Sequence, residues 1–371
     1  MKDTTRLILA GGFLGAGKTT LLFKATQLLM EDGKRVGLVT NDQASELVDT
    51  SFLLRTQVNV AEVSGSCFCC NFKGFTDSVL QVKQEARADI IIAEPVGSCT
   101  DLSATLMQPL KENFNKDLVI SPLSVLADPL RLADILDGGT AGLHPSAVYI
   151  FKKQLEESDF ILISKADLLD KKELDALKEK VEATYPFATV LAVSSKTGEG
   201  IKEWLKLLET STSIGQRILE IDYDTYAEGE AVLGWLNGTV TLKGVKTNWN
   251  KFVTDFLNDL ATQIDKMQLG VGHIKVLLEI EQEYITGNIT GSSETLSIRG
   301  EVGNSDFAQL TINARAEITP EILDELIKKV LKRTAGDNID VKTKAWKFLK
   351  PGYPKPTHRY KNVIYPCNDK S

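Results

Sequence analysis

Two short stretches of the sequence contain residues whose types and spacing suit them to bind phosphate and metal. The first is GFLGAGKT at residues 12–19, which fits the phosphate-loop pattern of glycine, four residues, glycine, lysine and threonine. An apolar run precedes it and a helical pattern begins at Lys18, so strand, loop and helix are expected. In such a loop the backbone N–H groups surround a polyphosphate, the lysine contacts the terminal phosphates and the threonine hydroxyl binds Mg²⁺. We therefore expect Mg²⁺ at Thr19, a catalytic contribution from Lys18, and nucleotide phosphates at Gly12, Gly15, Ala16, Gly17, Lys18, Thr19 and Thr20.

The second stretch, VSGSCFCCNF, places three cysteines within four residues. Thiolates prefer Zn²⁺ and similar transition-metal ions over Mg²⁺, and a turn of the backbone can direct all three sulfurs onto one ion. We expect Cys67, Cys69 and Cys70 to bind such an ion, with Zn²⁺ or Co²⁺ as the candidates. No fourth ligand is evident from the sequence. Single cysteines are commonly buried in protein cores, and this is our interpretation of Cys99 and Cys367.

Acidic residues follow two of the expected strands. Asp42, Glu46 and Asp49 lie in TNDQASELVDT, where a phosphate-loop GTPase has its first switch, and acids there can hold Mg²⁺ or orient water. Asp42 is accordingly a candidate catalytic residue, although solvated loop charges are an equal alternative for Asp42 and Glu46. Glu94 ends the apolar strand DIIIAEP and is the candidate acid beside Mg²⁺ and the attacking water, with Gly97 close to the γ-phosphate.

Two later stretches suit recognition of a guanine base. ILISKADLL resembles the guanine-reading Asn-Lys-x-Asp element of GTPases, with a simple strand-to-helix turn as the alternative. The resemblance implies that Asp167 accepts hydrogen bonds from guanine N1 and N2, which adenine does not offer, and that Lys165 lies along the ring. In VSSKTG, Ser195 and Lys196 match a second loop that contacts guanine. Ser164 stands where the usual element has asparagine, so GTP is favoured and ATP stays an alternative.

These residues require elements that place them along one edge of a sheet. Short apolar runs alternate with amphipathic stretches through residues 1–212, which predicts an α/β phosphate-loop domain with a mostly parallel sheet. Residues 221–335 predict a smaller α+β domain, for which a ferredoxin-like arrangement is one option, with Asn237 and Gly238 as a turn. We interpret His273, in an apolar strand, as a core residue rather than a ligand.

Composition limits the class of protein. The 371 residues are 43% hydrophobic, enough to build a core in each of two domains. The sequence has neither a long apolar run nor a secretory pattern, so we expect a cytoplasmic protein without a membrane partner. The net charge of -7 makes nucleic acid an unexpected partner. Five cysteines, three of them within four residues, argue for thiol chemistry rather than disulfides.

Residues 336–371 form a basic, proline-rich tail in this interpretation. Its mixture of lysines and aromatic residues could bind phosphate groups, a nucleic acid or an acidic client protein. The favoured alternative is an extended strap packed across the second domain, because prolines favour extended backbone and aromatic rings can be buried against a sheet.

Taken together, the motifs resemble those of the CobW-type metallochaperone GTPases, relatives of the hydrogenase and urease maturation GTPases. The resemblance is carried by GGFLGAGKTT, by the three clustered cysteines, by Glu94 to Gly97 and by SKADL. It implies GTP hydrolysis with Mg²⁺, a metal held by the cysteines, and nucleotide-dependent delivery of metal or a metal cofactor to a client metalloprotein or cofactor enzyme. The sequence departs from the family at Ser66, where glycine is usual, at Ser164, and in having no histidine-rich run.

Two other functions stay open at this point. One is a nucleotide-gated chaperone or activator of a corrinoid or other cofactor-dependent enzyme, in which the cysteines serve structure or redox chemistry. The other is an ATP-dependent regulator or nucleic-acid-binding protein that uses the basic tail. The sequence leaves the oligomeric state open between monomer and homodimer.

Overall fold

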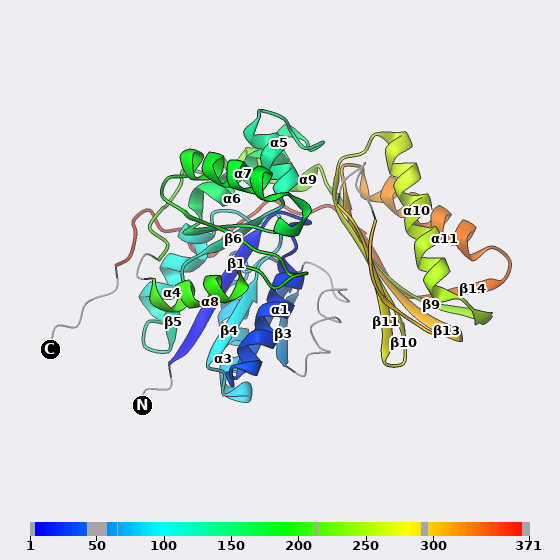
Figure 1. The fold of residues 1–371 in the computed structure, drawn as a ribbon, viewed down its shortest axis with the longest axis horizontal. Coiled ribbons are helices and arrows are strands. Elements are labelled where there is room, and N and C mark those ends of the chain that lie inside the picture. The colour runs from blue at the N-terminus through cyan, green and yellow to red at the C-terminus, as the bar shows by residue number, and fades with distance from the viewer. Residues whose placement is uncertain (1–3, 43–57, 65, 212–213, 291–295, 366–371) are drawn as a thin grey trace.

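The computed structural model describes residues 4–42, 58–64, 66–211, 214–290 and 296–365. These residues form two sheets, one in each half of the molecule (Figure 1). None of the helices in the described ranges is long and apolar enough to cross a membrane.

The first sheet confirms the predicted α/β domain, and its strands are all parallel where the sequence predicted a mostly parallel sheet. Its strands are ordered β3-β2-β4-β1-β6-β7-β8, and β5 also pairs with β1. All of the pairings are parallel, so the carboxyl ends of the strands meet along one edge. The strands are β1 (Thr5–Gly12), β2 (Val36–Asp42), β3 (Asn59–Ser64), β4 (Ile90–Glu94), β5 (Leu118–Ile120), β6 (Ser124–Ala127), β7 (Phe160–Ile163) and β8 (Thr189–Ala192).

Both faces of this sheet are buried. Leu7 and Leu9 of β1 pack into one core, while Ile8 and Ala10 pack into a second core on the opposite face together with Trp204. Alternate residues of a strand point to opposite faces, so a continuous apolar run is what helices on both sides require. The helical segments are α1 (Lys18–Glu31), α3 (Phe72–Ala86), η1 (Ser103–Met107), α4 (Gln108–Asn113), α5 (Pro129–Leu136), α6 (Pro145–Glu157), η2 (Ala166–Leu168), α7 (Lys171–Thr184), α8 (Ile201–Thr210) and α9 (Tyr223–Ala231).

The second sheet is antiparallel and ordered β12-β11-β10-β13-β9-β14. Two helices, α10 (Trp249–Met267) and α11 (Pro320–Ala335), pack against it with their apolar sides (Figure 1). Without the β11–β12 hairpin at its edge, the chain order is β–α–β–β–α–β, that of ferredoxin-like folds. The strands are β9 (Gly234–Thr247), β10 (Val271–Ile280), β11 (Glu283–Ile289), β12 (Ser297–Glu301), β13 (Ser305–Ala316) and β14 (Ile339–Leu349).

The predicted turn at Asn237 and Gly238 is wrong. Both residues lie inside β9, where they pair with Asn313 and Ile312 of β13. Glycine is needed at position 238 for a packing reason, because an added Cβ would lie 2.3 Å from the ring of Trp346. Asparagine followed by glycine therefore marks a close contact between neighbouring strands here rather than a reversal of the chain.

The predicted tail and domain boundary also differ from the structure. Residues 339–349 form β14, which pairs with β9 inside the second sheet, so residues 336–371 are not a separate tail. At the other boundary, α9 packs on α6 of the first domain, and Gly229 lies so close that an added Cβ would be 2.4 Å from the carbonyl oxygen of Ser146. The second domain therefore begins with β9.

Residues 350–365, here called the terminal segment, return to the first domain. The amide of Tyr360 donates to the carbonyl of Ala104 at 3.1 Å, and the amide of Thr357 donates to that of Cys69 at 2.8 Å. The segment runs back toward the first domain in red in Figure 1. Part of the predicted tail, residues 339–349, therefore packs on the second domain as expected, but residues 350–365 cross the nucleotide-binding domain instead.

Candidate nucleotide and metal site

The phosphate loop has the strand–loop–helix geometry that its sequence predicted. β1 ends at Gly12 and α1 begins at Lys18. Gly15 and Gly17 have φ angles of +80° and +83°, which favour glycine because other residues meet steric strain there. The Lys18 Nζ donates to the carbonyl oxygens of Gly12 at 2.8 Å and Phe13 at 3.2 Å. The ammonium group is thus held over its own loop, where the phosphates of a nucleotide would lie.

Thr19 and Glu94 lie against each other beside this loop. The Thr19 hydroxyl lies 3.0 and 3.1 Å from the two carboxylate oxygens of Glu94, and both side chains are buried. They meet because β4, which ends at Glu94, is the neighbour of β1. An oxygen-only donor set of hydroxyl and carboxylate suits Mg²⁺. Thr19 and Glu94 therefore lie next to each other, as expected for two residues beside one Mg²⁺ ion.

Gly97 follows Glu94 and approaches the phosphate loop closely. A Cβ added to Gly97 would lie 2.9 Å from the Nζ of Lys18 and 2.8 Å from the Cδ2 of Leu14. The backbone of Gly97 therefore occupies a position that a larger residue could not take without displacing these side chains. Thr20 lies in the first turn of α1 and is half-buried, and Ala16 is buried.

The residues expected to contact the base converge at the far end of the sheet. The Ser194 hydroxyl donates to Asp167 at 2.6 Å, and the Nζ of Lys196 lies 3.8 Å from the other oxygen of that carboxylate. Ser195 is half-buried in the same loop. Lys165, whose φ is +50°, precedes them and forms an ion pair of 2.7 Å with Asp128. The structure thus brings together the two stretches that the sequence assigned to one base.

Two residues here have roles that the sequence did not indicate. Asp128 caps α5 by accepting from the amides of Leu130 and Arg131, and also pairs with Lys165. Aspartate before proline at the start of a helical pattern is the signal that could have identified the cap. Ser164 replaces the usual asparagine, and its hydroxyl donates to the Ala127 carbonyl at 3.0 Å.

The expected switch region falls mostly outside the described residues. Asp42 ends β2 at the same edge of the sheet as Glu94, but its side chain is outside the described part of the structure, as are Glu46 and Asp49. The described residue Asn41 has a clear role. Its side-chain amide donates to the carbonyls of Val63 and Ser66 at 2.8 Å each, and its oxygen accepts from the Phe68 amide at 2.9 Å. The end of β2 is therefore attached directly to the loop that carries the cysteines.

The three clustered cysteines come together with a fourth that the sequence analysis assigned to the core. The sulfurs of Cys67 and Cys69 are 3.0 Å apart, and those of Cys69 and Cys70 are 4.0 Å apart. The sulfurs of Cys67, Cys69 and Cys99 all lie within 4.8 Å of one another. Cys99 is buried in the core as expected, but our interpretation of it as a single core cysteine is wrong, because it lies against two other sulfurs. Its position two residues after Gly97, in a loop at the same sheet edge, is the signal that could have identified it. Cys367, interpreted in the same way, lies outside the described residues.

Hydrogen bonds among these thiols shift their pKa values in opposite directions. Hydrogen bonds from Cys69, Cys70 and Cys99 hold the pKa of Cys67 well below its usual range. Donation to Cys67 raises the pKa of Cys70 to about 11 and the pKa values of Cys69 and Cys99 well above their ordinary value. Thiols placed this close to one another are the arrangement of a site from which a metal ion displaces protons.

The terminal segment covers the cysteines. The amide of Lys355 donates to the Sγ of Cys70 at 3.3 Å, and the hydroxyl of Thr357 donates to the carbonyl of Cys70 at 3.1 Å. The ring of His358 packs edge-on against Phe72, with 5.0 Å between ring centres. Residues nearly 300 positions apart in the chain therefore form one wall of the cysteine site.

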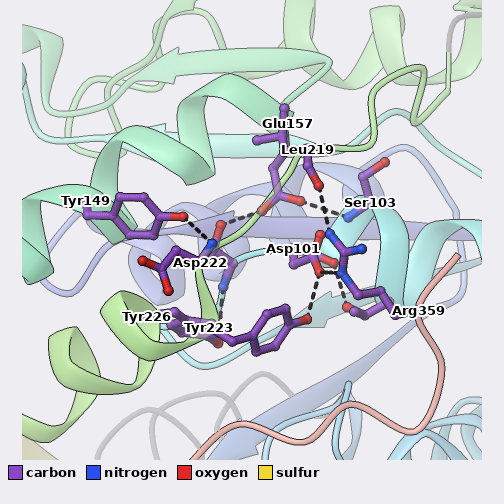
Figure 2. A network of polar contacts seen from close by, with 11 residues as sticks. Asp101, Ser103, Tyr149, Glu157, Leu219, Asp222, Tyr223, Tyr226 and Arg359 are labelled. Carbon is purple, nitrogen blue, oxygen red and sulfur yellow. Dashed lines mark hydrogen bonds and ion pairs between the residues drawn. The ribbon is translucent and has the colours of Figure 1, made fainter. Parts of the chain in front are cut away.

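A buried polar network holds the terminal segment to the loop after Cys99 (Figure 2). Asp101 is 1% exposed with a φ of +66°, and accepts from Arg359 at 2.6 Å and from the Tyr223 hydroxyl at 2.7 Å. Glu157 accepts from the amide of Ser103 at 2.8 Å, and burial raises its pKa to about 8. Figure 2 shows these groups converging from α6, α9 and the terminal segment.

Arg131 connects the phosphate loop to the second domain. One of its nitrogens donates to the Leu14 carbonyl at 2.7 Å, and the other donates to the Val271 carbonyl at 2.6 Å and also contacts the Thr290 carbonyl. The side chain is buried, so its bonds to Leu14 and Val271 form away from water. Rearrangement of the loop around a nucleotide would therefore change contacts with β10.

His273 of β10 is a half-buried strand residue whose Nδ1 is buried, in keeping with the core position that the sequence analysis favoured. Its Nδ1 has no hydrogen-bond partner within the described ranges, and burial holds the pKa of the imidazole well below its usual range. It is not a member of the metal-capable group formed by Cys67, Cys69 and Cys99.

Comparison with known proteins places this domain in a family. The model of the CobW/HypB/UreG nucleotide-binding domain matches residues 6–192. The zinc chaperone CobW of Sinorhizobium sp is 29% identical over 214 residues, which is 51% of this chain and 58% of that protein. The zinc-regulated GTPase metalloprotein activator 1 of Dictyostelium discoideum is 23% identical over 209 residues, 48% of this chain and 44% of that protein. The chain thus spans about half the length of these relatives.

Solved structures with a related fold are more distant. HypB from Helicobacter pylori in complex with nickel is 18% identical with a TM-score of 0.42, over 57% of this chain and 92% of that one. Zn(II)-bound YjiA GTPase from E. coli is 13% identical with a TM-score of 0.36, over 88% of this chain and 99% of that one. These structures are too distant to add to the assignment, which depends on the match of residues 6–192 and on the phosphate-loop site within them. The chain belongs to the CobW/HypB/UreG family.

Proposed function

We propose that this protein is a GTP-hydrolysing metallochaperone that binds a transition metal at its cysteines and delivers the metal, or a metal cofactor, to a client protein. The main support for the proposal is that residues 94–99 run from the phosphate site to the cysteines. This loop places Glu94 against Thr19, Gly97 against Lys18, and the Cys99 sulfur beside those of Cys67 and Cys69. One short segment therefore contacts both the phosphate site and the cysteines.

The phosphate site supplies the groups needed for hydrolysis. Lys18 neutralises charge on the terminal phosphates, and Thr19 with Glu94 offers the oxygen ligands that would hold Mg²⁺ directly or through water. When bound, Mg²⁺ offsets the negative charge that develops between the β- and γ-phosphates. Asp42, at the end of the strand next to β4, is the proposed residue for orienting the attacking water.

The base site favours guanine. The carboxylate of Asp167 is oriented by the Ser194 hydroxyl, so its oxygens are preorganised to accept from N1 and N2 of guanine. Lys165 lies beside it, oriented by its ion pair with Asp128, and the loop containing Ser195 and Lys196 closes the other side. At the same positions adenine has an acceptor at N1 and only a C–H group at C2, so an aspartate here disfavours ATP.

The metal is the cargo in this proposal. Neighbouring sulfurs from Cys67, Cys69 and Cys99 fit Zn²⁺ or Co²⁺ better than a hard ion such as Mg²⁺. The names of the relatives that match this chain, zinc chaperone and zinc-regulated metalloprotein activator, support zinc as the first candidate. Free thiols persist in a reducing compartment, which supports a cytoplasmic location.

The test is a titration of reduced protein with Zn²⁺ and Co²⁺ in the presence of GDP or a non-hydrolysable GTP analogue. We expect metal affinity to differ between the two nucleotides and to fall in Cys69→Ser, while nucleotide affinity in that variant stays unchanged. The reciprocal effect of metal on nucleotide affinity should have the same magnitude. Equal metal affinity with both nucleotides would contradict the proposal and favour a nucleotide-gated activator of a cofactor enzyme, in which the cysteines serve structure.

A further inference from the structure

We propose that Cys99 is a fourth metal ligand, completing a four-sulfur site with Cys67, Cys69 and Cys70. This inference rests on the proposed function, since it concerns the same metal. It goes beyond the three-cysteine motif because Cys99 lies in a different loop, after β4 rather than after β3. The chemical class of ligand follows from the donors. Four thiolates suit a tetrahedral Zn²⁺ or Co²⁺ ion.

The sulfur positions are close to those of a tetrahedral site. Metal–sulfur bonds of about 2.3 Å give sulfur–sulfur edges of about 3.8 Å in a tetrahedron. The Cys69 and Cys70 sulfurs are 4.0 Å apart, the Cys67 and Cys69 sulfurs are 3.0 Å apart, and Cys99 lies within 4.8 Å of both Cys67 and Cys69. Shifts of about 1 Å therefore bring the sulfurs of Cys67, Cys69 and Cys99 to these edges. Cys70, which lies outside that group of three but 4.0 Å from Cys69, would complete the site by rotation of its half-buried side chain.

The surroundings of Cys99 are not those of an isolated core cysteine. Its side chain is 1% exposed, and Cys67 and Cys69, at 6% and 3%, are buried with it. A cysteine that only fills space packs against hydrocarbon, whereas the sulfur of Cys99 faces two other sulfurs. Three thiols buried against one another from two loops are unusual unless they share a ligand.

Hydrogen bonds hold the backbone carbonyl and the backbone amide of Cys99 in place. The side chain of Gln154, 1% exposed, donates to the carbonyls of Gly97 at 2.9 Å and Cys99 at 2.7 Å, and the Cys99 amide donates to the Val96 carbonyl at 2.9 Å. These bonds set the direction of the Cys99 side chain toward the other loop. Gln154 is therefore a positioning residue for this ligand.

A four-thiolate site needs compensation for its charge. Binding of a divalent ion to four thiols forms four metal–sulfur bonds and releases the thiol protons to solvent, which leaves a net charge of two negative units. Cys69 and Cys70 lie just before the amino terminus of α3, the positive end of a 15-residue helix. The amide of Lys355 also donates to the Cys70 sulfur. Both features stabilise negative charge at the site.

The position of Cys99 also explains how a nucleotide could affect the metal. Cys67, Cys69 and Cys70 lie on one loop, while Cys99 is two residues from Gly97, which contacts the side chains of Lys18 and Leu14. Movement of Gly97 toward a γ-phosphate would therefore displace one of the four ligands. Removal of Cys99 should weaken the metal site and also reduce its dependence on nucleotide.

X-ray absorption of the zinc-loaded full-length protein provides the direct test. We expect four sulfur neighbours at about 2.3 Å in the wild type, and three sulfurs with one lighter atom in Cys99→Ala. Zinc affinity should fall at least about 100-fold in Cys99→Ala, more than outer-shell changes typically cost. The difference in zinc affinity between GDP and the GTP analogue should also shrink. Nucleotide affinity of metal-free Cys99→Ala serves as the control for folding.

The outcomes separate this inference from the proposed function. Zinc bound by three sulfurs in the wild type, with Cys99→Ala unchanged in affinity and spectrum, would overturn the role of Cys99 and leave the proposed function standing. Gln154→Glu, which keeps the size of the side chain but removes the donor, should lower zinc affinity less than Cys99→Ala does. Wild-type protein that binds no zinc in any nucleotide state would overturn both.

Discussion

Replacing Arg359 by alanine should release the terminal segment from the cysteine site. Arg359 donates to Asp101 at 2.6 Å and to the Leu219 carbonyl at 2.8 Å, and its side chain is 31% exposed against 2% for that of Asp101. The variant leaves the buried carboxylate of Asp101 with the Tyr223 hydroxyl as its side-chain hydrogen-bond donor among the described residues. The contact therefore controls how firmly residues 350–365 are held against the first domain.

The magnitude follows from the burial of the pair. Breaking a buried ion pair by removing one partner costs about 3 to 5 kcal/mol. Arg359 is partly exposed and Tyr223 keeps its bond to Asp101, so we expect about 2 kcal/mol here. Each 1.4 kcal/mol is a tenfold change in an equilibrium constant, so opening of the segment should become about 30-fold more frequent.

Hydrogen exchange of the amides of Thr357 and Tyr360 measures this opening. Both amides are hydrogen-bonded to the first domain, to Cys69 and Ala104, and exchange only when the segment detaches. We expect their exchange to accelerate about 30-fold in Arg359→Ala, accompanied by faster alkylation of Cys70 in metal-free protein. The matched control is Lys361→Ala, which removes an exposed positive charge from the same segment.

Two results would refute this reasoning. Unchanged exchange of both amides in Arg359→Ala would mean that the ion pair does not hold the segment. Equal acceleration in Lys361→Ala would mean that the net charge of the segment, and not its buried contact, is responsible.

Three further predictions concern the nucleotide site and the buried acids. Lys18→Ala should lower GTP affinity at least about 100-fold, because it removes a charged donor to the terminal phosphates. Titration with a fluorescent nucleotide measures this affinity, and a near-wild-type value would contradict the role of Lys18. Asp167→Ala should reduce the preference for GTP over ATP about 100-fold or more, because it removes two hydrogen-bond acceptors. Competition binding measures this preference, and a wild-type preference for GTP in the variant would exclude Asp167 as the residue that contacts the base. Burial raises the pKa of Glu157 to about 8, so the folded protein keeps a proton that the unfolded chain loses from its ordinary pKa of 4.5 upward. The stability that protonated Glu157 contributes is complete below pH 4.5 and is lost as the pH rises to about 8, so the Tm should decline over this range. In Glu157→Gln this decline in Tm should be smaller. A pH profile identical to that of the wild type would show that other groups cause the decline.

The tertiary contacts explain which sequence predictions succeeded. The parallel sheet was predictable because its strands are buried on both faces and read as continuous apolar runs such as that of β4. The prediction at Asn237 and Gly238 failed because a local turn signal cannot report that the ring of Trp346, over 100 residues later, lies against Gly238. The tail prediction failed for a similar reason. The basic and aromatic residues of β14 look irregular in sequence, and only pairing with β9 orders them.

The sequence by itself determined the two local chemistries of this protein. The phosphate loop and the Cys67–Cys70 cluster are each contiguous, so the backbone alone brings their groups together. The tertiary structure decided what joins them. The order β3-β2-β4 places the loops that follow β3 and β4 at one edge, which brings Cys99 to Cys67 and Cys69, and the return of the chain places Lys355 on Cys70. Such contacts between distant residues depend on strand order and on the path of the chain, which no local pattern of residues encodes.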